Sequence, residues 1–286
     1  MCSSDLHRWR WATASPLRVP APVVCVGNLV AGGAGKTPVA IAVAERLLAA
    51  GKRAQFVTRG YGGSARGPLQ VKSHHTAAAV GDEALLLAAV APTFIADDRY
   101  AGARMAVAMG ANAVVFDDGF QNPTIAKDVS LLVVDTGYGF GNGRTLPAGP
   151  LREPASFGLA RASALVLLGD GDFPGPTPAI PALRARLTPT DESAAKLRGQ
   201  RVIAFAGIGR PRKFFDTLRA LGCTLLAEHA FADHHPFASS EIQTLLSEAR
   251  TADALLVTTR KDFVRIALQQ RAGIEVLDVK IGRAHV

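Results

Sequence analysis

The chain has 286 residues, of which 48% are hydrophobic and 20% are charged, a composition that excludes an intrinsically disordered chain and allows one large domain or two small ones. Its formal charge of +8 favours anionic partners such as phosphates or acidic lipid surfaces, and without zinc-ligand spacing or an RNA-binding signature, nucleic acid is not an expected partner. The three cysteines follow no disulfide pattern, as is typical of a reducing compartment.

The two ends of the chain are predicted to be artefacts of DNA sequencing. Residues 1–6 and 281–285 can be encoded by stretches of DNA that are reverse complements of each other, as expected from read-through into an adapter. We therefore exclude residues 1–6 and 281–286 from the fold prediction. We expect the natural protein to be longer at both ends.

Apolar, β-branched runs alternate with helical stretches along the chain, which predicts an α/β fold with a mostly parallel sheet and flanking helices. Strands are predicted at residues 23–26, 54–58, 93–96, 113–116, 131–134, 164–168, 202–206, 224–227, 254–258 and 275–279. Helices are predicted at residues 36–50, 83–90, 99–109, 211–221, 239–249 and 261–269. The Pro/Gly-rich stretch 169–189 is predicted to connect a first lobe, residues 7–168, to a smaller second α/β lobe, residues 190–280.

A glycine-rich loop follows the first predicted strand and precedes the first predicted helix. The strand, the loop, Lys36-Thr37 and the helix together are typical of a P-loop NTPase, in which the backbone and the helix N-terminus hold nucleotide phosphates. The strict pattern has glycine where this chain has Val30, so the loop is a deviant form. Lys36 is expected to reach the β- and γ-phosphates, and Thr37 is expected to bind Mg²⁺. The predicted nucleotide-binding residues are Gly32, Gly33, Ala34, Gly35, Lys36, Thr37 and Pro38.

Acidic residues at two predicted element boundaries are candidates for catalysis. Asp117 and Asp118 end the strand at 113–116, where carboxylates beside a P-loop can orient Mg²⁺. The alternative is an ordinary Asp-Asp-Gly turn. Asp82 precedes the helix at 83–90, where it is either an N-cap or a general base for a hydroxyl that attacks the γ-phosphate.

The segment Phe231-Ala-Asp-His-His-Pro-Phe237 is the densest polar cluster of the second lobe. On a strand, His234 and His235 would point to opposite faces, so one of them could tune a catalytic carboxylate while the other faces solvent. Exposed loop histidines are one alternative. A metal site is the other, although no further ligand spacing completes it.

Two glycine-rich loops carry arginines that could bind a substrate phosphate. Thr58-Arg-Gly-Tyr-Gly-Gly63 contains one arginine and one tyrosine, and the segment 139–154 contains Arg144 and Arg152. Any one of these arginines alone would be read as a surface charge.

Taken together, these motifs resemble the tetraacyldisaccharide 4′-kinase family, the lipid A kinases. The shared motifs occur in the family's order between residues 23 and 279. They are Gly-Asn-x-x-x-Gly-Gly-x-Gly-Lys-Thr-Pro, Arg-Gly-Tyr-Gly-Gly, Gly-Asp-Glu, Asp-Asp-Gly-x-Gln, Gly-Asn-Gly-x-x-x-Pro-Ala-Gly-Pro-Leu-Arg-Glu-Pro and Asp-His-His. The Pro-Ala-Gly-Pro-Leu-Arg-Glu-Pro run is much more specific than any P-loop.

The resemblance implies transfer of the γ-phosphate of ATP, with Mg²⁺, to the 4′-hydroxyl of a lipid-linked glucosamine disaccharide 1-phosphate in lipid A biosynthesis. It makes Lys36 a catalytic residue, Asp82 the base and His234 the partner of Asp82 in an Asp–His dyad. The implied metal-side residues are Thr37, Asp117, Asp118 and Glu83. The residues implied to lie towards the disaccharide are Arg59, Tyr61, Asn142, Arg144 and Arg152.

The implied location is the cytoplasmic face of the bacterial inner membrane, where the protein would be peripheral or anchored by an N-terminal segment missing from this chain. Its partners would be the lipid disaccharide 1-phosphate and an anionic membrane surface. Arg8-Trp-Arg-Trp11 would then be the interfacial end of the missing segment, because Trp and Arg suit a headgroup layer.

The chain departs from the family pattern at one position, and two alternative functions are also considered. The family often has histidine after Asp-Asp-Gly-x-Gln, whereas this chain has Asn122, so no acid or base role is expected there. The first rival is a P-loop kinase or ligase that acts on a soluble metabolite. The second is a regulatory switch ATPase, although such switches characteristically carry lysine where this chain has Ala31.

Overall fold

The strand that leads into the glycine-rich loop lies in the middle of a large sheet. The computed structural model describes residues 9, 11–173 and 179–283. Within them, β1 (Val23–Gly27) is flanked by β5 (Ala113–Asp117) and β6 (Val129–Asp135), and all three are parallel. Val26 is in register with Asp117, so the carboxyl ends of β1 and β5 are adjacent.

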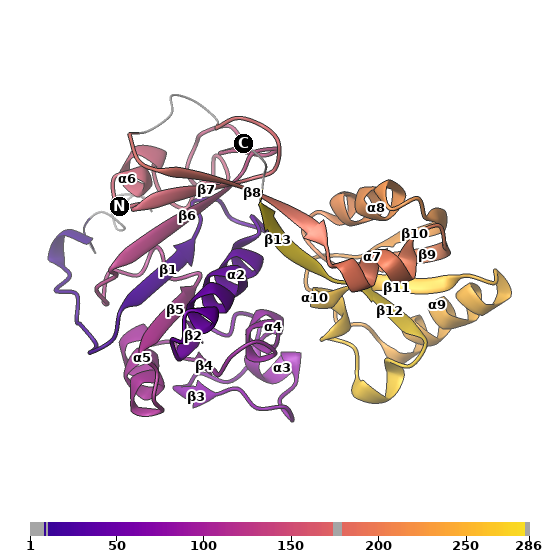
Figure 1. Cartoon of the computed structure of the whole chain (residues 1–286), viewed down its shortest axis with the longest axis horizontal. Helices are drawn as coiled ribbons and strands as arrows, with labels where there is room; N and C mark the ends of the chain where they lie inside the picture. The colour runs from indigo at the N-terminus through magenta and orange to yellow at the C-terminus, as the bar shows by residue number, and fades with distance from the viewer. Residues whose placement is uncertain (1–8, 10, 174–178, 284–286) are drawn as a thin grey trace.

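The large sheet of the described residues has nine strands in the order β13-β8-β7-β6-β1-β5-β2-β4-β3 (Figure 1). Its antiparallel pairs lie at the two ends, where β13 pairs with β8 and β3 pairs with β4. The strands not yet named are β2 (Ala54–Thr58), β3 (Leu69–Gln70), β4 (Thr93–Ile95), β7 (Ala164–Leu168), β8 (Ala182–Pro189) and β13 (Val279–Arg283).

Helices cover both faces of this sheet because its central strands are apolar on both sides. The helices are α2 (Lys36–Ala49), α3 (Ala77–Val80), α4 (Asp82–Ala88), α5 (Arg99–Ala108) and α6 (Ala155–Leu159). Side chains of a strand alternate between faces: Val114 and Phe116 of β5 share a cluster with Ala103 of α5, whereas Val115 shares one with Val39 of α2.

A smaller lobe repeats this layered arrangement with four parallel strands in the order β10-β9-β11-β12 (Figure 1). Phe214 and Leu218 pack on one face of its sheet, and Ile242 and Leu245 pack on the other. Its strands are β9 (Arg201–Ala206), β10 (Thr224–Ala230), β11 (Leu255–Thr259) and β12 (Ile274–Leu277). Its helices are α7 (Asp191–Leu197), α8 (Pro211–Ala220), α9 (Ser239–Thr251), α10 (Arg260–Phe263) and the 3₁₀ helix η1 (Leu268–Gln270).

An antiparallel pair of strands joins the two lobes. β8 leads the chain out of the large sheet and β13 brings it back, with Pro189 paired to Val279 (Figure 1). Residues 281–283, which are predicted to be adapter-derived, belong to β13. Their origin stays a prediction, and residues 1–6 lie outside the described residues.

The predicted α/β class is confirmed, and three of the local differences affect segments that the sequence analysis had assigned. The predicted connection 169–189 ends in the strand β8. The sequence does not indicate this strand, because most of its side chains are exposed and it has no apolar run. Only Asp278 separates β12 from β13, so the predicted single strand at 275–279 is two strands, and the second belongs to the large lobe. The predicted helix at 261–269 is shorter in the structure, because α10 ends at Phe263, turns follow it, and the 3₁₀ helix η1 begins at Leu268.

Candidate active site

The glycine-rich loop has a backbone that requires glycine at two positions. Gly32 and Gly35 have φ angles of 102° and 80°, which side chains other than glycine rarely adopt. A Cβ atom at Gly35 would also lie 2.3 Å from Cδ2 of Leu168. No described side chain caps the N-terminus of α2, so its backbone N–H groups remain available to an anion.

The first residues of α2 contact the acidic pair that ends β5. Oγ1 of Thr37 donates a hydrogen bond to Oδ2 of Asp117 at 2.8 Å. Nζ of Lys36 lies 3.8 Å from Oδ1 of Asp118. The structure therefore brings together the P-loop and Asp-Asp residues that the sequence predicts for phosphate and metal binding, because β1 and β5 are neighbours.

The two carboxylates of this pair have opposite electrostatic environments. Burial raises the pKa of Asp117 to about 7, and the negative charge of Glu83 adds to the shift. Burial acts in the same direction on Asp118, but Lys36 and Arg152 outweigh it and hold the pKa of Asp118 below its ordinary value. Asp118 is thus the ionised member at neutral pH, and the charge on Asp117 is finely balanced.

The acidic pair fits a divalent cation. Oδ1 of Asp117 is buried and has no hydrogen-bond partner among the described residues, a state that costs free energy unless a ligand supplies the missing contact. Thr37, Asp117, Asp118 and Glu83 offer only oxygen donors, which Mg²⁺ prefers. Among the described residues, no three His, Cys, Asp or Glu side chains form a preassembled metal cluster.

Arg152 reaches the acidic pair because its loop is bound to the P-loop. The N–H of Ala31 donates to the carbonyl of Pro150, and the N–H of Arg152 donates to the carbonyl of Leu29, each at 2.8 Å. Nη1 of Arg152 lies 3.2 Å from both carboxylate oxygens of Asp118. In the structure Arg152 therefore contacts the acidic pair. Its predicted contact with the disaccharide stays a prediction.

Asn142 shapes the same loop from within. Its Nδ2 donates to the carbonyl of Ala148 at 2.9 Å, and its Oδ1 accepts the N–H of Arg144 at 3.1 Å. A Cβ atom at Gly149 would lie 2.1 Å from this Oδ1, so only glycine fits there. Asn142 thus folds the loop, and the substrate roles predicted for Asn142 and for the exposed Arg144 stay predictions.

Asp82 and His234 meet although 152 positions separate them in the sequence. Asp82 begins α4 in the large lobe and is buried, whereas His234 lies in the small lobe after β10. Nδ1 of His234 is 3.0 Å from Oδ2 of Asp82. The backbone of His234 has a φ of 60°, a local strain of the kind often found at functional sites.

The surroundings of His234 favour one tautomer. Nζ of Lys261, a donor only, lies 3.3 Å from Nε2 of His234, so Nε2 is the acceptor and Nδ1 carries the hydrogen that faces Asp82. The same Nζ is 3.6 Å from Oε1 of Glu83. Glu83, predicted as a metal-side acid, therefore also links α4 to the small lobe.

A cavity of about 570 Å³ opens beside His234. The ring of Tyr61 meets the His234 ring edge-on with centroids 5.7 Å apart. Arg59 lies at the same opening, with its Nε 3.6 Å from Oδ1 of Asp97. The lining residues are Arg59, Gly60, Tyr61, Gly62, Gly63, Arg66, Asp233 and His234.

Close backbone packing fixes the Tyr61 loop against the start of α4. A Cβ atom at Gly81 would lie 2.5 Å from the carbonyl oxygen of Tyr61, and one at Gly60 would lie 2.8 Å from that of Val80. Gly81 also has φ 87° and ψ 148°, a region that is nearly exclusive to glycine. The Arg-Gly-Tyr-Gly-Gly and Gly-Asp-Glu motifs therefore form one structural unit.

His235 has different partners from His234. Its Nε2 lies 3.0 Å from Oε2 of Glu241, and its ring stacks on Phe231 with centroids 4.7 Å apart. These contacts bind the loop to α9 and to the apolar cluster of the small lobe. His235 thus stabilises the fold of the small lobe, whereas His234 contacts the candidate base.

Sequence reasoning missed ion pairs that Asp82 and Asp135 make across the lobe boundary. Arg265 binds Asp82 through Nε at 2.8 Å, and no motif marks it. Asp135, at the end of β6, binds Nη1 of Arg210 and Nζ of Lys213, each at 2.6 Å. Asp135 did carry a signal, because it ends an apolar strand in the same way as Asp117.

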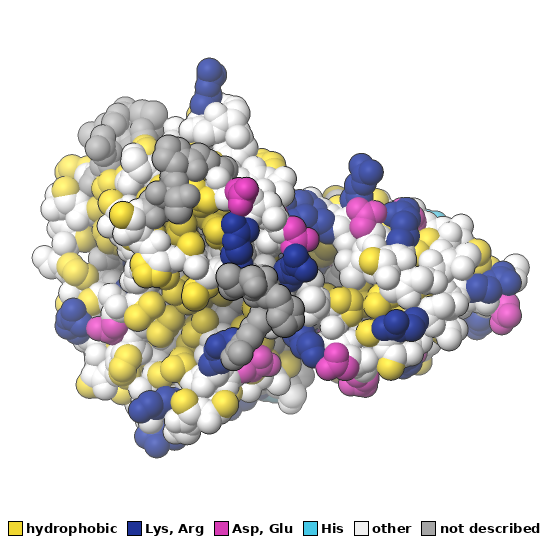
Figure 2. Space-filling view, turned by 45° about the horizontal axis from the view of Figure 1, so that its top comes forward, with side chains coloured by type: hydrophobic (Ala, Val, Ile, Leu, Met, Phe, Trp, Pro, Cys, Tyr) yellow, Lys and Arg dark blue, Asp and Glu magenta, His cyan; other side chains and the backbone are white. Residues whose placement is uncertain are grey.

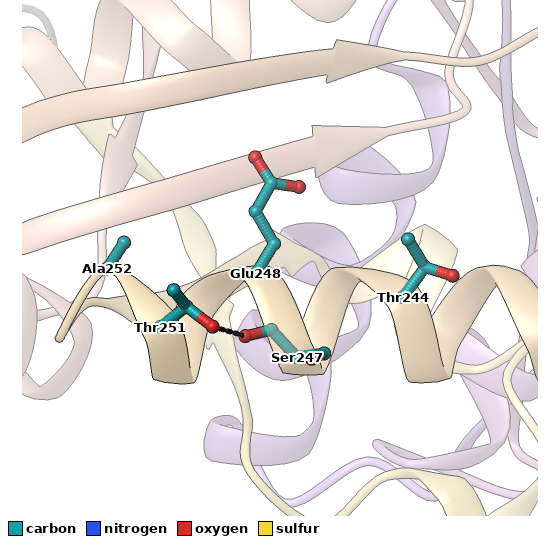
Figure 3. A pocket seen from close by; sticks show the side chains of 5 residues that line it. All are labelled: Thr244, Ser247, Glu248, Thr251 and Ala252. Carbon is teal, nitrogen blue, oxygen red and sulfur yellow. Dashed lines mark hydrogen bonds between the residues drawn. The ribbon is translucent and has the colours of Figure 1, made fainter.

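A second cavity, of about 640 Å³, lies on α9 and takes its lining from that helix alone: Thr244, Ser247, Glu248, Thr251 and Ala252. Figure 3 shows these side chains along the helix, with Oγ1 of Thr251 donating to the carbonyl of Ser247 at 2.9 Å. Glu248 is paired with Nε2 of His229 at 2.9 Å. This cavity contains none of the predicted site residues.

Asp117→Asn should stabilise the nucleotide-free chain above pH 7. Because the folded-state pKa of about 7 exceeds the ordinary value of 3.8, the wild type loses stability as the pH rises from about 4 to about 7. Asparagine has no proton to lose there. We expect the melting temperature of the variant to exceed that of the wild type by about 5 °C at pH 8, but not at pH 4.

Asp118→Asn is the matched control and should have the opposite sign, because the pKa of Asp118 is lowered. Its stability deficit should be present at pH 8 and vanish as the pH falls below about 4. Thermal unfolding of the three chains without nucleotide or Mg²⁺ measures both effects. Equal behaviour of the two variants would contradict the assignment of the pKa shifts.

Comparisons with known proteins identify the family. The family model of tetraacyldisaccharide-1-P 4′-kinase matches residues 3–284. A tetraacyldisaccharide 4′-kinase of Rhodospirillum centenum is 55% identical over 279 residues, covering 96% of this chain and 82% of the relative. One of Paramagnetospirillum magneticum is 54% identical over 274 residues, covering 94% and 84%.

A solved structure agrees with the sequence comparisons. The crystal structure of the "apo" form of LpxK from Aquifex aeolicus in complex with ATP superposes with a TM-score of 0.78. It is 25% identical to this chain, and the alignment covers 98% of this chain and 91% of the other. The chain described here belongs to the tetraacyldisaccharide 4′-kinase family of ATP-dependent phosphotransferases.

Proposed function

We propose that this chain transfers the γ-phosphate of ATP to the 4′-hydroxyl of a lipid-linked glucosamine disaccharide 1-phosphate. The observation that carries the proposal is the Asp82–His234 pair, with 3.0 Å between Oδ2 and Nδ1, at the border of a cavity of about 570 Å³. Membership of the family supports the identity of the acceptor. The P-loop geometry supports the identity of the donor.

The phosphates of ATP would bind along residues 32–38. The N-terminus of α2 and the loop N–H groups would face the phosphate oxygens, and Lys36 would offset the charge that grows on the transferred group. A small-lobe loop borders this site, because a Cβ atom at Gly209 would lie 3.9 Å from the backbone nitrogen of Gly33. The nucleotide would therefore contact both lobes.

Mg²⁺ would be held by Thr37 and the acidic pair Asp117 and Asp118, with Glu83 nearby. The unpartnered Oδ1 of Asp117 supports this assignment. When bound, the ion supplies positive charge that neutralises the nucleotide phosphates. A cation there would also favour the ionised form of Asp117, whose pKa burial raises to about 7.

The acceptor hydroxyl would reach the Asp82–His234 pair from the cavity side. Asp82 would take the proton of the hydroxyl as the general base. The imidazole of His234 faces Oδ2 of Asp82 through Nδ1 and would stabilise Asp82 after it has taken the proton. Tyr61, Arg59 and Arg66 line the same cavity. Their position supports contacts with the disaccharide.

We also propose that the protein acts at the cytoplasmic face of the inner membrane. Its formal charge of +8 would attract it to an anionic surface. Large exposed hydrophobic side chains include Trp9, Leu17 and Leu146, and Figure 2 shows hydrophobic side chains gathered on one face of the large lobe. None of the described helices is long and apolar enough to cross a bilayer, and Arg8 and Arg10 lie outside the described residues.

Lys36→Ala should abolish phosphate transfer, because the charge on the phosphates is no longer offset. The assay measures labelled lipid formed from γ-labelled ATP and a detergent-solubilised disaccharide 1-phosphate. We expect a loss of about 10²-fold or more, whereas the control Lys52→Ala, which removes an exposed lysine, should label lipid like the wild type.

Near-normal labelling by Lys36→Ala would refute the P-loop assignment. Transfer to a water-soluble acceptor without lipid or detergent would favour a kinase or ligase of a soluble metabolite. ATP-dependent dimerisation without any labelled acceptor would favour a switch ATPase.

His234→Ala and His235→Ala should have different effects although the residues are adjacent. His234→Ala should lower kcat by about 10²-fold with little change in ATP affinity, because it removes the partner of Asp82. His235→Ala should mainly lower the melting temperature, because it removes contacts to Glu241 and Phe231. The reverse result would mean that the other histidine of the pair serves the reaction.

A further inference from the structure

Arg265 reaches across the lobe boundary to the candidate base. It follows α10 in the small lobe, and its Nε donates to Oδ2 of Asp82 at 2.8 Å. The side chain of Arg265 is 6% exposed and that of Asp82 is 3% exposed. Two opposite charges withdrawn from water in this way need further hydrogen bonds to hold their geometry.

The other side of the guanidinium is anchored within the small lobe. Nη1 of Arg265 donates to the carbonyl of Gly207 at 2.8 Å and to Oδ1 of Asp262 at 2.9 Å. Asp262 is fully buried, and it also accepts from the N–H of Gly207 at 2.9 Å and from Oγ1 of Thr259 at 2.6 Å. The planar guanidinium therefore has one orientation, with Nε directed at Asp82.

The carbonyl of Gly207 couples Arg265 to His234. It accepts from Nη1 of Arg265 at 2.8 Å and from the backbone N–H of His234 at 3.1 Å. The two groups that contact Oδ2 of Asp82 thus share one backbone anchor. Lys261, the nearby cation, lies at Nε2 on the far side of the imidazole and at Glu83, so Arg265 is the cation that fixes Asp82.

On the basis of the proposed function, we propose that Arg265 is a positioning residue for phosphate transfer. It holds the carboxylate of Asp82 in the orientation in which it can contact both His234 and the acceptor hydroxyl. Arg265 acts through Asp82 and not on the substrate. A small displacement of a positioned group can cost about 10²-fold in rate.

Arg265→Met and Arg265→Lys test this role. The Met variant should lower kcat by about 10²-fold with a much smaller change in KM for ATP, because the P-loop residues themselves are untouched. The Lys variant should recover part of kcat, because it keeps the charge but cannot donate hydrogen bonds to Asp82, Gly207 and Asp262 at the same time. Arg260→Met, which removes an ion pair to Asp278 outside the site, should keep the wild-type kcat.

A double-mutant cycle separates positioning from general stability. In an Asp82→Asn background, Arg265→Met should change kcat by no more than about twofold, because the carboxylate that it positions is gone. If the two losses multiply instead, Arg265 acts through the fold and the proposal is overturned. An Arg265→Met variant with wild-type kcat also overturns it.

An acceptor-independent measurement keeps this test apart from the proposed function. The N–H of Glu83 donates to Oδ1 of Asp82 at 2.8 Å, so its hydrogen exchange reports on the carboxylate. Arg265→Met should accelerate that exchange by about tenfold, and Arg260→Met should not. Unchanged exchange in Arg265→Met overturns the positioning role. Absence of lipid labelling by the wild type overturns the proposed function, and the exchange data still decide the role of Arg265.

Discussion

The buried carboxylate of Asp82 is the contact on which the site depends. It belongs to the large lobe, yet both groups at its Oδ2, Nε of Arg265 and Nδ1 of His234, belong to the small lobe. A buried ionised carboxylate is costly unless it is paired and hydrogen-bonded. The candidate base therefore keeps both partners of its Oδ2 only while the two lobes lie together, so the proposed reaction site depends on their arrangement.

The parts of the site that were predictable from sequence depend on neighbours in the chain. Glycines before Lys36 and an apolar strand before them predict the P-loop, and Asp117 ends another apolar strand. Because parallel strands end at the same edge of a sheet, the contact from Thr37 to Asp117 follows once β1 and β5 are adjacent. The Asp82–His234 contact followed from the family resemblance, and its geometry agrees with that expectation.

The parts that were not predictable depend on contacts between distant segments. Arg265 stands in no motif, and only the folded small lobe directs it at Asp82. α10 also ends after one turn, although the sequence pattern favours a longer helix. β8 shows no apolar run because few of its side chains are buried, so its place beside β7 and β13 cannot be inferred from composition.

The most direct test is the single-turnover rate of phosphate transfer by Asp82→Asn saturated with ATP, measured together with its Kd for ATP. If the carboxylate between the lobes is the base, the rate per ATP-bound molecule falls by about 10² to 10⁴-fold while the Kd stays at the wild-type value. A rate per ATP-bound molecule near that of the wild type would contradict the account. Asp82 would then serve only as the first residue of α4.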